Sequence, residues 1–204
     1  MTPAEILTAV KARTGRTSIT SIATELDGVL KDITKRYDFL KDYKTVTLTA
    51  AQSDYDIEAD LAITELKEVL EVRDSDGEEI SKVDNRGGFL DKTASESTGT
   101  PTLWWVYDKR GTSAMSKMLF FYPTPDTAES VTIYYSFYHP TPTSVILLPD
   151  TFKECVIEGV CYEIYRGLGE ADKGQAHKLE YEAKLARLIS QEPEDLSKVV
   201  YRDV

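Results

Sequence analysis

The hydrophobic period of the chain changes twice, and this change limits the fold more than any other feature of the sequence. Apolar residues recur at helical spacing up to about residue 40, alternate from 44 to 138, and return to helical spacing from 148 to 190. Helices repeat about every 3.6 residues and strands every second residue. The sequence therefore predicts an α+β protein in which N-terminal and C-terminal α-helices form a helical bundle, with an antiparallel β-sheet or meander inserted between them.

The same pattern predicts the domain boundaries. Residues 1–43 contain the N-terminal helices, and residues 148–190 form a C-terminal helical hairpin that belongs to the same helical module. Residues 44–147 are a β-rich insertion. Pro193 and its acidic neighbours cannot continue the last helix, so 191–204 is expected to be an extended C-terminal tail.

Helix-start signals are clear at the N-terminus. Thr2 can cap the first helix, and Glu5, three residues later, completes a capping box. A second, longer helix is expected to begin with a cap at Thr17 or Ser18 and to continue to about residue 37. Its apolar positions form an unbroken amphipathic stripe.

Period-two segments predict the strands. Alternation and strand-forming residue types predict strands at 44–49, 79–83, 103–107, 118–122 and 131–138. The last three are interpreted as an antiparallel meander. Segment 61–72 fits either period, so both helix and strand stay open there, with a hairpin through the turn at 74–77 favoured.

The C-terminal hairpin has recognisable ends. Its first helix is expected to begin near Asp150 and to break at Gly167 and Gly169. The second helix carries an apolar stripe made of Ala176, Leu179, Ala183 and Ala186.

The charge of the chain narrows its possible partners. The formal net charge is −11, distributed as +2 over residues 1–44 and −13 over residues 45–204. An acidic body repels phosphate, so DNA can pass nearby but specific binding is not expected. The sequence has no membrane-spanning run and no signal-peptide pattern at its start, so we expect no membrane partner and assembly in the cytoplasm.

Residues that could carry chemistry are few and scattered. His139 and His177 lie in different elements, without further ligands at coordinating spacing. Cys155 and Cys161 are expected to be buried apolar thiols. We therefore predict no catalytic residues, no metal site and no cofactor, and the chain is not expected to be an enzyme.

Aromatic residues are concentrated in the predicted sheet, on both of its faces. One interpretation is a core on one face with ordinary exposure on the other. The second is that the outer face packs on a neighbouring subunit, because exposed aromatic patches mark interfaces. On the second interpretation, the subunit-interface residues are Trp104, Tyr134 and Tyr138.

The order of these segments resembles the head-to-tail adaptor (connector) proteins of tailed bacteriophages, of the tail-tubular-protein-A-like family. The resemblance covers nearly the whole chain, and its order is more diagnostic than any one motif. It rests on the segments 37–40, 45–49, 52–57, 59–61, 99–101, 119–126, 131–135 and 148–150, together with Trp105.

The resemblance implies a structural virion protein of the neck, between capsid and tail. Its partners would be further copies of itself in a ring, typically a dodecamer, the portal protein, and a tail nozzle or tube protein, with DNA passing through the bore. We expect the tail to bind the portal through Leu196, Val199, Val200, Tyr201 and Arg202. The polar loop 84–100 and the turn at 108–117 are expected to contact the tail-side partner through Phe89, Asp91, Lys92, Lys109 and Arg110.

A different class of function stays open at this point. A small protein with a net charge of −11 could present a phosphate-like array and act as an acidic DNA-mimic inhibitor of a DNA-binding enzyme. The two functions differ in stoichiometry, because an adaptor forms a ring and an inhibitor binds its enzyme as a monomer or dimer.

Overall fold

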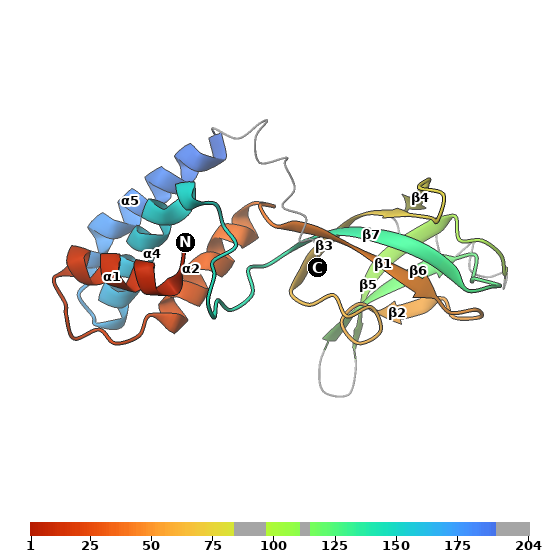
Figure 1. Ribbon diagram of the computed structural model, residues 1–204, viewed down its shortest axis with the longest axis horizontal. Coiled ribbons are helices and arrows are strands. Elements are labelled where there is room, and N and C mark those ends of the chain that lie inside the picture. The colour runs from red at the N-terminus through yellow and green to blue at the C-terminus, as the bar shows by residue number, and fades with distance from the viewer. Residues whose placement is uncertain (84–96, 111–114, 191–204) are drawn as a thin grey trace. The chain divides into compact units, whose positions relative to one another are not determined.

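The computed structural model describes residues 1–83, 97–110 and 115–190 (Figure 1). The chain divides into two compact units. One contains Met1–Leu40 together with the described residues from Tyr138 onward, and the other is Lys41–Phe137. We describe each unit by itself.

Helix α4 is the centre of the helical unit. This unit contains α1 (Pro3–Thr14), α2 (Ala23–Arg36), a 3₁₀ turn at Asp150–Phe152, α4 (Lys153–Gly167) and α5 (Ala171–Ser190). Helix α4 packs against α1, α2 and α5, and 9 of its residues are buried. A helix that is apolar on most of its circumference must be surrounded in this way.

The ends of the first two helices differ in how well the sequence predicts them. The capping box of α1 is confirmed, because Thr2 Oγ1 accepts from the Glu5 N–H and the Glu5 carboxylate accepts from the Thr2 N–H. The expected start of the second helix is wrong, since α2 begins at Ala23. Thr17 and Ser18 lie in a turn, and burial of Ile22 at the N-cap position decides the start instead.

The sheet has seven strands among the described residues. Their order is β1-β7-β3-β4-β5-β6-β2, and every neighbouring pair is antiparallel except β4 and β5, which are parallel. The strands are β1 (Lys41–Leu48), β2 (Asp54–Asp56), β3 (Leu66–Arg73), β4 (Glu79–Lys82), β5 (Leu103–Arg110), β6 (Met115–Tyr122) and β7 (Glu129–Phe137).

This topology overturns the expected fold class, a helical bundle with an antiparallel meander inserted. The structure is a mixed α+β fold, with four α-helices and a curled seven-stranded sheet in the described residues. In a meander β5, β6 and β7 would be consecutive neighbours, but β7 lies between β1 and β3 while β6 lies between β5 and β2. Alternation of apolar residues shows which face of a strand is buried and carries no information on which strand lies beside it.

Segment 61–72 is resolved as a strand with a preceding loop. Strand β3 begins at Leu66 and pairs with β4 through the turn at 74–77, with Val72 opposite Ile80. Leu61 and Ile63 are buried in the loop before it. The favoured hairpin is therefore confirmed. Leu61 and Ile63, which contributed to the helical spacing in this segment, belong to a packed loop.

The sheet unit has its own hydrophobic core. Trp104 is 1% exposed in this core, and its indole N–H donates to the Ile80 carbonyl at 2.8 Å. The other core residues are Leu48, Tyr55, Ile57, Leu61, Ile63, Val69, Val72, Ile80, Leu119, Phe121, Val131, Ile133 and Tyr135.

None of the helices in the described part of the chain combines the length and apolarity that crossing a bilayer requires.

Candidate interaction surfaces

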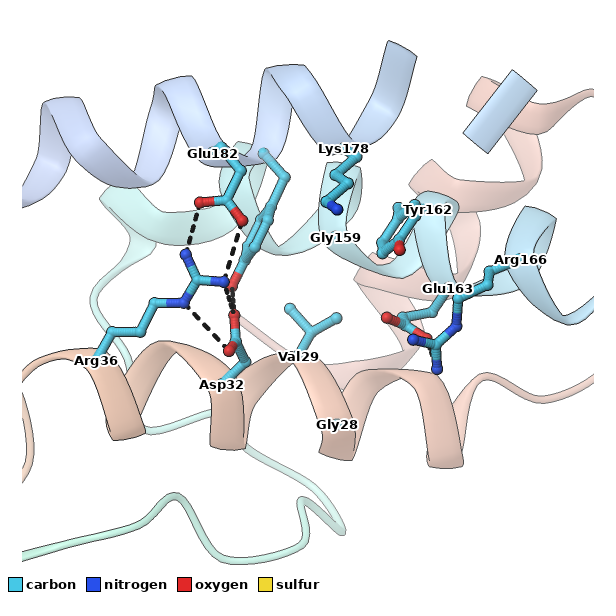
Figure 2. Close-up of a pocket in the computed structure, with 11 residues that line it drawn as sticks. Gly28, Val29, Asp32, Arg36, Gly159, Tyr162, Glu163, Arg166, Lys178 and Glu182 are labelled. Atoms are coloured by element: carbon cyan, nitrogen blue, oxygen red, sulfur yellow. Dashed lines mark hydrogen bonds and ion pairs between the residues drawn. The ribbon is translucent and has the colours of Figure 1, made fainter. Parts of the chain in front are cut away.

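A groove of about 380 Å³ runs between α2, α4 and α5 in the helical unit (Figure 2). Its floor lies where Val29 of α2 meets Gly159 of α4. A Cβ atom at residue 159 would lie 2.8 Å from Val29 Cγ1, which is closer than such atoms approach. The two helices can therefore pack at this distance only because α4 has a glycine there.

Arg36 closes one end of the groove. Its guanidinium bonds to Asp32 and Glu182 at 3.0 Å each and lies 5.8 Å from the centre of the Tyr181 ring, while the Tyr181 hydroxyl donates to Asp32 at 2.7 Å. The hydrogen bonds that Arg36 donates to Glu182 raise the pKa of Arg36, and burial raises the pKa of Tyr181. Arg36 therefore stays cationic and Tyr181 stays protonated, and together they tie α2 to α5.

Tyr162 lies at the other end, between two cations. The Arg166 guanidinium is 5.9 Å and the Lys178 ammonium 5.6 Å from its ring centre, and Arg166 also pairs with Glu163 at 2.7 Å. The groove is lined without Ser, Cys or His, so it lacks the nucleophile and base pair of an acyl-transfer site. In the residues that the structure describes, no three potential ligands gather to hold a metal ion.

A buried carboxylate joins three helices. Glu158 of α4 is 3% exposed, accepts from His177 at 2.7 Å and from Lys184 at 3.1 Å, and pairs with Arg13 of α1. Burial by itself would raise the pKa of Glu158, but the two hydrogen bonds from α5 and the charges of Lys184 and Arg13 outweigh burial and lower it. Sequence reasoning missed this network, although an acidic residue within the apolar run of α4 was a signal that a cationic partner exists.

His139 and the two cysteines have structural environments. The Leu147 N–H donates to His139 Nε2 at 2.9 Å, and the other ring nitrogen bonds to the Pro140 carbonyl at 2.5 Å. Burial lowers the pKa of His139, which keeps the ring neutral. The expected burial of Cys155 and Cys161 is confirmed, and desolvation raises the pKa of each thiol to about 12.

The outer face of the sheet carries an aromatic pair. Tyr43 of β1 and Tyr134 of β7 are opposite each other, with ring centres 5.8 Å apart, and the Arg73 guanidinium lies 5.8 Å from the Tyr134 ring. Tyr43 is 42% exposed. Tyrosine and arginine are enriched at protein interfaces, so this face is a candidate contact surface.

Helix α5 turns the apolar stripe found in its sequence toward solvent. Ala176, Leu179, Ala183 and Ala186 are all exposed, and Leu179 has 62% of its surface accessible. The core-facing residues of α5 are instead Gly174, Tyr181 and Leu185. The stripe therefore does not serve the packing of its own helical unit.

The structure locates some of the predicted site residues. Trp104 is buried in the sheet core, Tyr134 and Tyr138 are partly exposed, and Lys109 and Arg110 are exposed at the end of β5, opposite Ser116 and Met115. The remaining ones lie outside the described residues: Phe89, Asp91, Lys92, Leu196, Val199, Val200, Tyr201 and Arg202.

A chain whose charged clusters tie helices together, and whose aromatic and apolar side chains extend to its surface, has the features of a structural protein that works through contacts. The comparison with protein families makes this specific. The chain belongs to the SU10 adaptor protein family, whose model matches residues 1–202, and it is therefore a structural adaptor protein of phages and a component of the virion neck. No curated protein matches the chain. The phage-adaptor interpretation is thus confirmed, while the match does not distinguish the tail-tubular-protein-A-like type.

Proposed function

We propose that this protein forms a homo-oligomeric ring, a dodecamer, that joins the portal to the tail nozzle or tube and surrounds the DNA exit channel. The family match over residues 1–202 carries the proposal. The net charge of −11 supports it, because a negative surface lets DNA slide without binding. Cryo-electron microscopy of the protein mixed with its portal should show twelve copies around the portal axis. A monomer or dimer in the presence of portal would contradict the proposal.

The helical hairpins of neighbouring subunits pack side by side in the proposed ring, using the exposed stripe of α5. Leu179→Glu should prevent ring formation, because it places a charge in an apolar helix contact. Thr24→Glu is the matched control, since it adds the same charge to an exposed position of α2. Native mass spectrometry, with portal present, measures the stoichiometry. Equal ring formation by both variants would exclude α5 from the interface.

The aromatic face of the sheet is the second subunit contact that we propose. Trp104 is buried within its own chain, and Tyr138 follows the end of β7 and belongs to the helical unit, so the contact on the sheet rests on Tyr134. Tyr134→Ser should weaken the ring while leaving the sheet core intact, because Tyr134 is only partly buried. Ring stoichiometry at decreasing protein concentration measures this effect, and an unchanged dissociation midpoint would argue against the contact.

The C-terminal tail is the proposed portal-binding segment. Leu196, Val199, Val200 and Tyr201 are its apolar anchors, with Arg202 beside them. A segment that orders on binding can span a long contact, at some expense in affinity. Deleting residues 192–204 should abolish portal attachment, and a shuffled tail of the same composition is the control. Unchanged attachment after deletion would refute the role of the tail.

The opposite partner is proposed to contact the loop 84–100 and the β5–β6 turn. Lys109 and Arg110 are exposed at the end of β5 that leads into the β5–β6 turn, whereas the loop 84–100 precedes the start of β5 at Leu103. Shortening 92–99 to a tight turn should reduce nozzle attachment and spare ring formation. Full attachment of the shortened protein in a pull-down with the nozzle protein would contradict this assignment.

A further inference from the structure

The sheet unit has a basic pocket within an acidic part of the chain. A pocket of about 220 Å³ lies between the start of β3 and the strands β5 and β6, where β4 ends at Lys82. Its charged lining residues are three lysines, Lys67, Lys82 and Lys117, and one carboxylate, Glu68. Residues 45–204 have a net charge of −13, so this lysine pocket is opposite in sign to its surroundings. A local positive excess of this kind attracts an anionic partner.

The ion pairs at the lysine pocket can exchange partners. Lys82 pairs with Glu68 at 3.3 Å and Lys117 pairs with Asp108 at 3.7 Å, and these four side chains are between 38% and 60% exposed. Exposed pairs contribute little to stability. A carboxylate from another molecule can therefore replace Glu68 or Asp108 at small cost.

The turn at the other end of β3 is acidic and rigid. Asp74 Oδ1 accepts from the N–H groups of Asp76 and Glu78 at 2.9 Å each, so the Asp74 carboxylate is used inside the turn. Asp76, Glu78 and Glu79 are exposed. The acidic turn, residues 74–79, thus presents three carboxylates on a backbone that its own hydrogen bonds fix. A preorganised segment of this kind loses less affinity to ordering when it binds.

The acidic turn and the lysine pocket of one chain cannot meet. They lie at opposite ends of β3, which extends from Leu66 to Arg73. At about 3.3 Å per residue these ends are roughly 23 Å apart. A contact between turn and pocket therefore requires two copies of the chain. It joins different surfaces of the two copies, and such heterologous contacts can generate a ring.

We propose that the acidic turn of one copy inserts into the lysine pocket of the next copy, with Glu78 as the residue that enters. Glu79 is less suited because it belongs to β4 and lies opposite Arg73, and Asp76 is shorter by one methylene group. Trp105 and Val106 line the pocket and suit the aliphatic part of Glu78, while its carboxylate pairs with Lys117. The inference rests on the proposed ring and gives it a direction.

A second copy fits the lysine pocket better than DNA or a small molecule does. Pockets for small-molecule ligands usually have about 300–1,000 Å³, and a grip on DNA needs cations spread along its backbone. Arg73 also connects the acidic turn to the aromatic face, since it donates to the Gly77 carbonyl at 3.3 Å and lies 5.8 Å from the Tyr134 ring centre. The turn therefore adjoins a surface that is already proposed as a subunit contact.

Carbodiimide cross-linking of the full-length protein tests the contact. The reagent joins a carboxylate to a lysine when the two are in contact, and mixing unlabelled with isotopically labelled copies identifies the links between copies. With portal present, mixed-isotope peptides should join residues 76–79 to Lys67, Lys82 or Lys117. Rings that form without these mixed peptides overturn the proposal. This measurement uses the unaltered sequence, so it does not depend on the folding of any variant.

Exchange of the charges tests whether the contact contributes to association. Glu78→Lys and Lys117→Glu should each weaken association of the copies about fivefold, and the double variant should restore it. Glu58→Lys is the matched control, because it makes the same charge change at an exposed position outside both the turn and the pocket. General repulsion between acidic copies predicts stronger association for Glu78→Lys. A double variant no better than either single variant overturns the proposal.

Stoichiometry and DNA complete the test. Twelve copies on the portal without mixed peptides leave the proposed ring standing and overturn the contact between turn and pocket. Mixed peptides in assemblies of another copy number support the contact and contradict the dodecamer. If Lys117→Glu weakens binding of a duplex DNA fragment and leaves association of the copies unchanged, the pocket contacts DNA and the proposal is overturned.

Discussion

Gly159 is the residue at which the packing of the helical unit is most sensitive to a small change. In Gly159→Ala the new Cβ would lie 2.8 Å from Val29 Cγ1 and 3.1 Å from Tyr181 Cδ2. Alanine improves helix propensity by about 1 kcal/mol. Overpacking of a tight core costs about 1–3 kcal/mol, and here Tyr181 cannot move freely because Asp32 holds its hydroxyl. We expect a net loss of about 1–2 kcal/mol in the free energy of unfolding.

Two further variants separate crowding from helix propensity. Gly28→Ala is the matched control, since a Cβ there would meet nothing within 4 Å, and it should stabilise the protein by about 0.5–1 kcal/mol. Val29→Ala by itself should destabilise by about 2 kcal/mol, because it opens a cavity. Combined with Gly159→Ala, it gives room to the new methyl group, so the double variant should be more stable than the sum of the single effects by at least about 1 kcal/mol.

Urea unfolding followed by far-ultraviolet circular dichroism measures these differences. The two units can unfold in separate transitions, so the comparison uses the transition that carries most of the helical signal. Gly159→Ala at or above the wild-type stability would refute the argument. Strict additivity with Val29→Ala would refute it as well, because the loss would then have another origin.

Three other predictions follow from buried groups. Glu158→Gln should lower the free energy of unfolding by about 2 kcal/mol at neutral pH, because it weakens charged hydrogen bonds. Since the folded-state pKa of Glu158 is lowered from 4.5, its stabilisation is present above that value and is lost as the pH falls through the folded value, so the variant should show a flatter decline in urea midpoint below about pH 5. Trp104→Phe leaves the buried Ile80 carbonyl without its donor and should cost about 1–3 kcal/mol in thermal or urea unfolding; an unchanged midpoint would contradict this. Cys155 and Cys161, with thiol pKa values of about 12, should react with Ellman's reagent only after unfolding, and rapid labelling of the folded protein would show that they are accessible.

Local signals in the sequence predicted local structure well. The capping box at Thr2 and Glu5 fixes the start of α1, because both hydrogen bonds lie within one turn. The turn at 74–77 and the strands on both sides of it were also readable, since a hairpin depends on nearby residues. The start of α2 was not, because burial of Ile22 in the helical unit prevails over the available caps at Thr17 and Ser18.

The strand order could not be derived from these signals. Ile133 of β7 faces Lys44 of β1 on one side and Val72 of β3 on the other, and these partners are far from it in sequence. Period-two alternation is the same whichever strands are neighbours. The parallel pairing of β4 with β5, with Ser81 opposite Leu103, could not be predicted from the sequence for the same reason.

The sequence also could not show which surfaces are covered by the chain's own residues. The apolar stripe of α5 was visible in the sequence, but a stripe does not say whether its own chain or another chain covers it. The structure decides this by placing Tyr181 and Leu185 in the core and leaving Leu179 exposed. Glu158 was missed for a related reason, since its partners Arg13 and Lys184 come from two other helices.

The division of the chain into two units determines which of them can fold first during synthesis. The sheet unit, Lys41–Phe137, is one continuous stretch, whereas the helical unit needs residues from both sides of it. Helices α1 and α2 leave the ribosome before α4, the helix against which both of them pack. Since domains form as their residues emerge, the sheet can complete its core while these two helices still lack their partner. A released chain that ends before residue 153 would therefore hold a finished sheet and an unfinished helical unit, which exposes Ile6 and Leu30 to chaperones.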